Sequence, residues 1–281
     1  MLTDVPEEEW TWDETLYAGS APHYVAGRMP YPAALGRVLV DTLNLDGTGR
    51  LLDVGCGPGS LTLLLAPHVA EAVGVDADSG MLAQAARRAR EQGARNVSWH
   101  RLRAEELPAG LGTFRVVTFA QSFHWMDQAR VAGRVRRLLE PGGAWVHVKA
   151  TTHQGVPGED PLPAPRPPWE EIRRLVQAYL GTTPRAGQGV LPRPRSGEED
   201  VMRAAGYRGP QRLHVEQGQV VRRSLDEVVS AVFSLSSSAP HLFGDRLADF
   251  EHELRALLRE ASPAGGFAER IEDIDVVIWR P

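Results

Sequence analysis

Short apolar runs alternate with amphipathic segments through the first half of the chain. Five runs have the length and apolar character of buried strands, at residues 51–54, 72–75, 97–102, 114–120 and 144–149. Apolar spacing of helical period predicts helices at residues 33–43, 60–65, 78–92 and 128–139. Strands that alternate with helices indicate an α/β fold, a doubly wound and mostly parallel sheet with helices on both faces.

The pattern changes after residue 150. Residues 155–168 contain six prolines, which exclude a helix or a central strand there. Further on, the pattern predicts helices at 169–180, 226–235 and 242–260, and strands at 212–221 and 275–279. We expect one domain over residues 1–281, with a core at 33–150. Residues 151–281 would supply cap insertions, at 155–210 and 225–262, and the closing strands.

The first 32 residues are polar but unusually aromatic. They contain Trp10, Trp12, Tyr17, Tyr24 and Tyr31. A disordered tail is poor in aromatic residues, so we expect residues 1–32 to pack onto the rest of the chain as an N-terminal cap segment.

Composition narrows the class of protein. No apolar run reaches the roughly 20 residues that cross a bilayer, and the acidic start MLTDVPEEEW is unlike a signal peptide. Both features predict a cytoplasmic protein without a membrane partner. The formal net charge of −5 gives no overall basic field for nucleic acid. The single cysteine, Cys56, excludes an intrachain disulfide and a cysteine-cluster metal site, and no metal site is predicted. The oligomeric state cannot be predicted from the sequence.

A glycine-rich turn follows the first strand of the core. Gly55, Gly57 and Gly59 separate this strand from a helix, and such a turn lets backbone N–H groups approach a ligand. Asp76 follows Gly55 by 21 residues, at the end of the second strand, where its carboxylate can accept both hydroxyls of a ribose. The two features indicate a ligand that contains adenosine. Dinucleotide dehydrogenases have G-x-G-x-x-G, whereas here the spacing is G-x-G-x-G and Ser60 occupies the sixth position.

Five blocks in order resemble one family, the class I S-adenosylmethionine-dependent methyltransferases. They are residues 53–59 (DVGCGPG), 74–78 (GVDAD), 104–108 (AEELP), 119–127 (FAQSFHWMD) and 138–143 (LLEPGG). The blocks lie within residues 50–150, about a third of the chain, and residues 151–281 resemble the family only in the final strand. The resemblance implies a seven-stranded Rossmann-like methyltransferase fold with helical cap insertions and S-adenosylmethionine as cofactor.

The resemblance also implies roles for individual residues. Gly55 and Gly57 would line the methionine part of the cofactor, with Asp53 beneath them. Asp76 would bind the ribose. The remaining core contacts would be Ala77 and Met81 on the faces of the adenine, Ala104 and Glu105 at its edge, and Gln121 near the methionine end. Arg103 stands where the family often has an aspartate, so this sequence departs from the family pattern next to the predicted adenine contacts.

The segment SAPHYVAGRMPYP, residues 20–32, resembles the branch of trans-aconitate-like and ubiquinone-biosynthesis-like methyltransferases. In that branch the N-terminal segment folds over the cofactor. By this analogy Arg28 would pair with the cofactor carboxylate, and Tyr17 or Tyr24 would close the pocket. His23 and Trp125 are further candidates for the substrate side or lid.

His124 is the candidate catalytic base. It follows the fourth strand, where ligands lie in such sheets, and a histidine can take a proton from a hydroxyl or an amine. Packing of the loop is the alternative role. The predicted function is methyl transfer to a small molecule, for example in tailoring a secondary metabolite. An NAD-dependent oxidoreductase and a noncatalytic S-adenosylmethionine-binding protein are the alternatives.

Overall fold

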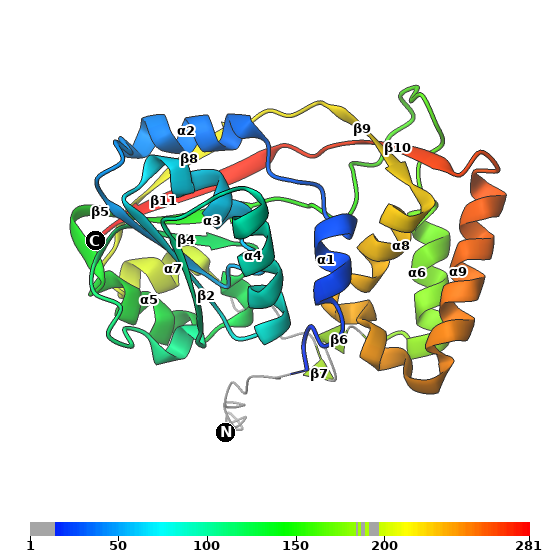
Figure 1. Ribbon diagram of the computed structural model, residues 1–281, viewed down its shortest axis with the longest axis horizontal. Coiled ribbons are helices and arrows are strands. Elements are labelled where there is room, and N and C mark those ends of the chain that lie inside the picture. The colour runs from blue at the N-terminus through cyan, green and yellow to red at the C-terminus, as the bar shows by residue number, and fades with distance from the viewer. Residues whose placement is uncertain (1–14, 184, 187–188, 191–196) are drawn as a thin grey trace, which may run out of the picture.

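A seven-stranded sheet forms the centre of the computed structural model, which describes residues 15–183, 185–186, 189–190 and 197–281 (Figure 1). The strand order is β3-β2-β1-β4-β5-β11-β8. Among the described strands of this sheet, β11 alone runs in the opposite direction to the other six. The strands are β1 Arg50–Val54, β2 Glu71–Asp76, β3 Val97–Arg101, β4 Phe114–Ala120, β5 Leu139–Lys149, β8 Arg208–Val215 and β11 Ile274–Arg280. This mixed, mostly parallel sheet confirms the predicted α/β methyltransferase fold.

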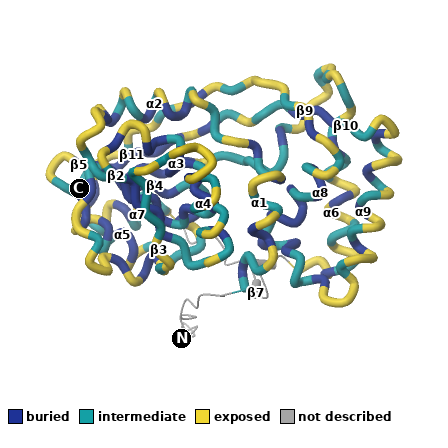
Figure 2. The backbone as a smooth tube through the Cα atoms, in the orientation of Figure 1, coloured by how far each residue is buried: buried dark blue, intermediate teal, exposed yellow. Residues whose placement is uncertain are grey.

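Helices cover both faces of the sheet because successive strand residues point to opposite sides. Leu51 packs in one cluster with α2 (Ala33–Leu43) and α3 (Ser60–Leu65), while Leu52 packs in the other cluster with α5 (Gln128–Arg136) and α7 (Glu198–Ala204). Helix α4 (Ser79–Glu91) contacts β2 and β3. Figure 2 shows the buried residues concentrated in the strands between these helices.

A second, helical unit, here called the cap, lies beside the sheet (Figure 1). It consists of α6 (Trp169–Leu180), α8 (Leu225–Phe233), α9 (Leu247–Ala261), the 3₁₀ segments η4 (Ser236–Ser238) and η5 (Pro240–Arg246), and the two-stranded sheet β9 (Val220–Ser224) and β10 (Gly266–Arg270). Phe233, Phe250 and Phe267 belong to its own apolar core. The N-terminal helix α1 (Ala21–Gly27) contacts α4 on one side and α8 on the other, so it joins the cap to the sheet. The remaining short strands, β6 (Arg185–Ala186) and β7 (Gly189–Val190), pair with each other.

A buried ion pair connects the cap to the segments around it. Arg223 of β9 and Glu269 of β10 lie 3.0 Å apart, and their side chains are 4% and 3% exposed. Arg223 also donates to the carbonyl oxygens of Gly27 and His153. Glu269 accepts from the backbone N–H of Gly155 and from the indole N–H of Trp169. One ion pair therefore joins α1, the linker after β5, α6 and the small sheet of the cap.

Most of the predicted core elements are confirmed. The helices at 33–43 and 60–65 and the strand at 114–120 have the predicted bounds, as does the later helix at 169–180. Asp78 caps α4 as predicted, because its side chain accepts from the N–H of Met81. Trp10 and Trp12, which the predicted N-terminal cap included, lie outside the described residues.

Three predicted elements were wrong in their bounds. The strand predicted at 212–221 is two strands, because at Gly218 (φ +56°) the chain leaves the large sheet for the cap. The helix predicted at 242–260 starts at Leu247, because Gly244 (φ 54°, ψ −132°) breaks it. The helix predicted at 128–139 ends at Arg136, and Leu139 already pairs with Phe114 in the sheet.

The range 155–210 does not belong wholly to the cap. Helix α7 packs against α5, and Arg208 begins β8, an edge strand of the large sheet. The chain therefore contributes α7 and β8 to the core before it forms the second part of the cap. No helix in the described part of the chain is long and apolar enough to cross a membrane.

Candidate functional site

A cavity of about 560 Å³ lies where β1, β2 and β4 end. Eleven of the residues that the sequence predicted for the site line it: Tyr17, Tyr24, Gly55, Gly57, Asp76, Ala77, Met81, Ala104, Glu105, Gln121 and Trp125. The carboxyl ends of parallel strands are where ligands bind in such sheets. The structure thus brings residues from five separate segments of the chain to one cavity.

The glycine-rich turn forms one wall of this cavity. Gly55 has φ +67°, and a Cβ on it would lie 2.5 Å from the Cβ of Ser122, so no larger residue fits. Gly57 has φ +53°, and a Cβ on it would meet no heavy atom within 4 Å. The turn is fixed from behind, since the N–H groups of Gly55 and Cys56 both donate to the carbonyl of Val75. The open space at Gly57 is where a ligand can approach the backbone.

Asp76 lies at the edge of this turn. Its two carboxylate oxygens accept from the backbone N–H groups of Gly57 (2.8 Å) and Asp78 (2.9 Å). These bonds fix the carboxylate and leave each oxygen a second lone pair for a ligand hydroxyl. Burial raises the pKa of Asp76 to about 6, although both hydrogen bonds oppose this shift. The geometry suits a group that accepts from the two hydroxyls of a ribose.

Asp53 does not line the cavity. It is 1% exposed and accepts from the hydroxyls of Thr62 (2.5 Å) and Thr118 (2.7 Å). Burial raises its pKa, against the effect of these hydrogen bonds. Asp53 therefore joins the first turn of α3 to β4 beneath the glycine-rich turn. Its predicted contact with the cofactor's amino group stays a prediction.

Aromatic residues form the opposite wall. Tyr17 contacts Trp125 edge-on, with ring centroids 6.3 Å apart, and Tyr24 at 6.4 Å. Leu16, Leu102, Ser122 and seven other residues also line the cavity but were not predicted. Leu102 directly follows β3. Because the sequence predicted this strand, the position of Leu102 at the ligand-binding edge of the sheet could have been inferred. Leu16 and Ser122 carry no comparable signal.

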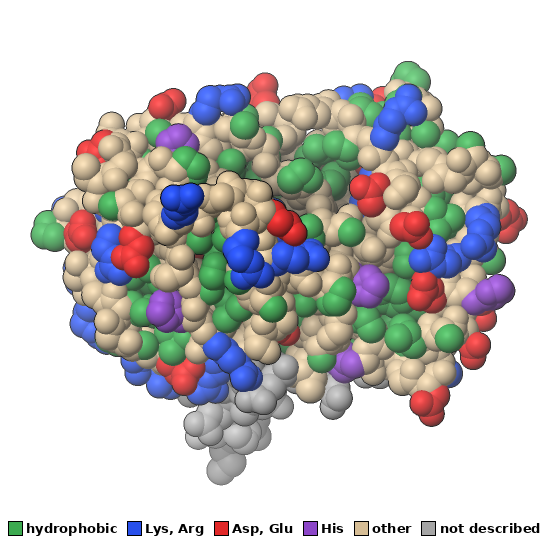
Figure 3. Space-filling view, in the orientation of Figure 1, with side chains coloured by type: hydrophobic (Ala, Val, Ile, Leu, Met, Phe, Trp, Pro, Cys, Tyr) green, Lys and Arg blue, Asp and Glu red, His purple; other side chains and the backbone are tan. Residues whose placement is uncertain are grey.

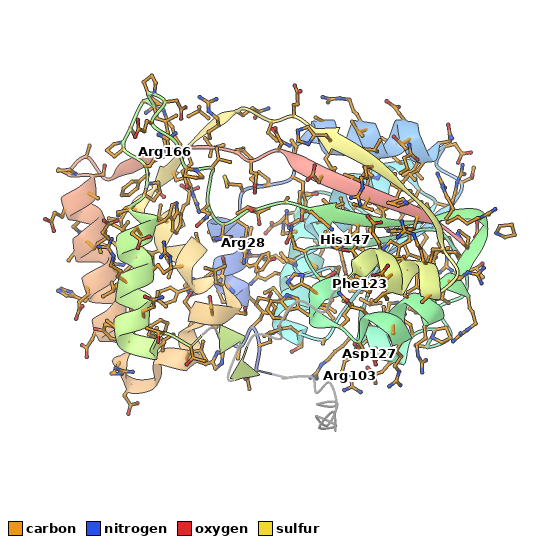
Figure 4. The ribbon with its side chains drawn as sticks, turned by 180° about the vertical axis from the view of Figure 1, so that it is seen from behind. Arg28, Arg103, Phe123, Asp127, His147 and Arg166 are labelled. Atoms are coloured by element: carbon orange, nitrogen blue, oxygen red, sulfur yellow. The ribbon has the colours of Figure 1, made fainter. Side chains whose placement is uncertain are left out.

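Arg28 lies away from the cavity wall. Figure 4 shows it at the end of α1, between the cap and the sheet. Its guanidinium donates to the hydroxyl (2.7 Å) and carbonyl (3.0 Å) of Ser234 and to the hydroxyl of Thr152 (3.3 Å), and it lies over the ring of Tyr24. No carboxylate pairs with Arg28 among the described residues. In this structure Arg28 joins α1 to the cap. The predicted pairing of Arg28 with the cofactor carboxylate stays a prediction.

Two of the candidate histidines face other parts of the molecule. The ring of His23 packs against Phe233 of the cap, with centroids 5.0 Å apart. His124 does not line the cavity, and although part of the residue is exposed, its ring packs against Trp125 with centroids 4.6 Å apart. Loss of hydration, and then the nearby His147, lower the pKa of His124 to about 4. At neutral pH His124 is therefore an uncharged, weakly basic ring.

Gln121 has a strained backbone at the cavity wall. Its φ is +56°, a region that residues other than glycine and asparagine rarely adopt. Its N–H donates to Val148 (3.3 Å), and the next residue, Ser122, donates through its hydroxyl to Val54 (2.6 Å). The first bond connects the residue after β4 to β5, and the second connects the next residue to β1, so the backbone around Gln121 is fixed at the cavity wall.

This strain leads to a prediction for two variants of Gln121. Gln121→Ala removes the carboxamide and keeps the strain, and we expect it to lower the affinity for S-adenosylhomocysteine by about 5- to 10-fold. Gln121→Gly should lower that affinity equally without lowering the free energy of unfolding, because glycine accepts positive φ. Calorimetric titration and urea unfolding measure the two effects. An Ala variant with unchanged affinity would remove Gln121 from the cofactor site.

Among the described residues, no group of three or more His, Cys, Asp or Glu side chains is arranged to hold a metal ion. Burial raises the pKa of the Cys56 thiol well above its usual value, so the single cysteine is not poised as a nucleophile.

Comparison with known proteins finds similarity to methyltransferases. Residues 51–143 match the family model described as a methyltransferase domain. The chain is 33% identical over 112 residues to the uncharacterized methyltransferase YcgJ of Bacillus subtilis. These residues make up 40% of this chain and 44% of that protein. It is 38% identical over 96 residues to a ubiquinone biosynthesis O-methyltransferase of Methylococcus capsulatus, 34% of this chain and 40% of that protein. The matches thus span less than half the length of these relatives.

The fold extends further than the sequence similarity. The crystal structure of the YcgJ protein has a TM-score of 0.50 and 18% identity, and the match covers 87% of this chain and 96% of that chain. Residues 51–143, which include the glycine-rich turn and Asp76, match a methyltransferase domain. The class I methyltransferases that the sequence resembles use S-adenosylmethionine as cofactor.

Proposed function

We propose that the chain transfers the methyl group of S-adenosylmethionine to a small-molecule acceptor. The observation that carries this proposal is the pairing of Asp76 with the open glycine-rich turn in one cavity. With its ribose bound to Asp76, the cofactor would have its methionine end beside Gly55 and Gly57. The methyl would then lie near Gln121, at the end of β4.

The cofactor supplies an activated methyl group on a sulfonium, so the protein's task is to position the acceptor behind it. Such positioning can supply about 7–11 kcal/mol of the barrier. In this chain Tyr17, Tyr24 and Trp125 line one side of the cavity, where their rings would limit the access of water to the reacting groups. Gln121 would orient the methionine end from the other side.

Three features favour a small molecule as the acceptor. The aromatic wall and the N-terminal residues narrow the cavity, which suits a compact ligand. On the face seen in Figure 3, basic and acidic side chains are interspersed, so this face presents no continuous basic surface for nucleic acid. One relative is named as a ubiquinone biosynthesis O-methyltransferase.

Mass spectrometry tests the proposed reaction. The purified chain, incubated with S-adenosylmethionine and a metabolite extract, should yield a compound heavier by one methyl group, together with S-adenosylhomocysteine. A matched incubation with Asp76→Ala should yield neither. If the wild-type chain binds the cofactor but methylates nothing in any extract, the alternative of a noncatalytic binding protein is favoured.

His124 gives a second prediction. Because its ring lies outside the cavity wall and has a pKa of about 4, we expect His124→Ala to reduce turnover by less than 10-fold. A general base contributes a factor of about 10² to 10⁴. A loss of two or more orders in turnover, with cofactor affinity unchanged, would instead assign the base role to His124.

A further inference from the structure

Residues 15–20 form a turn, here called the Tyr17 turn, that lies between the cavity and the cap. Backbone bonds close it, from Ala18 N–H to the carbonyl of Thr15 and from Ser20 N–H to the carbonyl of Tyr17, both 2.9 Å. Leu16 and Tyr17 line the cavity. The side of the Tyr17 turn that carries Leu16 and Tyr17 therefore covers the proposed cofactor site.

The other side of the Tyr17 turn contacts the 3₁₀ segment η5 of the cap. His241 Nδ1 lies 2.9 Å from the carbonyl oxygen of Ala18. Gly19 has φ +80°, and a Cβ on it would lie 3.3 Å from the Cβ of Pro240, so the backbone of Gly19 lies close to the Pro240 ring. Ser20 is fully buried in the same region. A cap residue more than 200 positions along the chain thus contacts the backbone next to Tyr17.

The bond to Ala18 determines the tautomer of His241. A carbonyl oxygen only accepts, so Nδ1 carries the proton and Nε2 is left with a lone pair. His241 Nε2 is buried and has no hydrogen-bond partner among the described residues. The histidine consequently has one polar bond in the part of the chain that the structure describes, and that bond ends on the Tyr17 turn.

We propose that His241 is a positioning residue of the cofactor site. By bonding to Ala18 it fixes the Tyr17 turn, and through that turn it keeps the Tyr17 ring against Trp125 over the cavity. The inference rests on the proposed cofactor binding and adds to it a dependence on the cap. Without the bond the Tyr17 turn opens more often, and a ligand beneath it leaves sooner.

Stopped-flow measurement of S-adenosylhomocysteine dissociation tests this role, with Trp125 as an intrinsic fluorophore in the cavity. We expect His241→Ala to raise the dissociation rate constant by about 3- to 10-fold, the range that one lost hydrogen bond gives. His241→Asn should restore much of the wild-type rate, because its amide N–H can occupy the place of Nδ1. The control is His252→Ala, since His252 is exposed on α9.

Hydrogen exchange at residues 15–20 gives a readout that does not depend on the cofactor. In His241→Ala the amides of Ala18 and Ser20 should exchange faster, while those of β1 and β4 keep their protection. Unchanged exchange and an unchanged dissociation rate would overturn the proposal. So would a general loss of protection with a lowered melting temperature, which marks a purely structural residue. If the wild-type chain does not bind S-adenosylhomocysteine, the proposed function fails, and the exchange result still decides the role of His241.

Discussion

Replacement of Asp76 by Ala should lower the affinity for S-adenosylhomocysteine by at least 100-fold. The carboxylate is fixed by the N–H groups of Gly57 and Asp78 and has lone pairs left for two ribose hydroxyls. Hydrogen bonds to a charged group contribute about 1.5–3 kcal/mol each, so the loss of two corresponds to at least two orders of magnitude. Calorimetric titration of both proteins measures the difference.

The same site should bind its cofactor less tightly in acid. Burial raises the pKa of Asp76 from 3.8 to about 6, and the protonated carboxyl can accept fewer hydrogen bonds. The affinity of the wild-type chain should therefore be constant above pH 7 and fall as the pH drops through about 6. The stability of the free protein should depend on pH in the opposite direction. Because the pKa of Asp76 is higher in the folded than in the unfolded state, the contribution of Asp76 to stability decreases as the pH rises from about 4 through 6. Asp76→Asn, which does not titrate, is the matched control and should show no such pH dependence of its residual binding.

The second large effect concerns stability. Glu269→Gln should lower the free energy of unfolding by about 3–5 kcal/mol, because it leaves the buried Arg223 without its counter-charge. The loss should be accompanied by weaker cofactor binding, since Arg223 also donates to Gly27 at the end of α1. Urea unfolding of the two proteins measures the change.

An exposed ion pair is the control for this experiment. Arg87 and Glu91 lie on the surface of α4, 3.7 Å apart and with more than half of each side chain exposed. Glu91→Gln should change the free energy of unfolding by less than about 0.5 kcal/mol. If Glu269→Gln costs no more than this control, the buried pair is not what joins the cap to its neighbours.

The core of the fold could be predicted because its signals are local. Buried strands such as β4 are short and mainly apolar, and Asp78 by itself marks the start of α4. The cap carries weaker signals. Strand β10 was not predicted, because residues 266–270 become a strand only by pairing with β9, more than 40 residues earlier. Helix α1 was not predicted as a helix either, since it is short and depends on α4 and α8 for its packing.

The candidate site also contains features that the sequence predicts and features that depend on contacts between distant segments. The glycine-rich turn and Asp76 lie on adjacent parallel strands, so their spacing along the chain already placed them at one edge of the sheet. The position of Arg28 depends on Ser234, and that of His241 on Ala18, two contacts between distant segments. Pairwise contacts of this kind leave no periodic pattern in the sequence, which is why only the structure reveals them.

The most direct measurement is a calorimetric titration of the purified wild-type chain at pH 7.5, with S-adenosylhomocysteine in one experiment and NAD in another. The account predicts saturable binding of S-adenosylhomocysteine with one site per chain and no binding of NAD. Binding of NAD alone, or binding of S-adenosylhomocysteine that persists undiminished in Asp76→Ala, would contradict it.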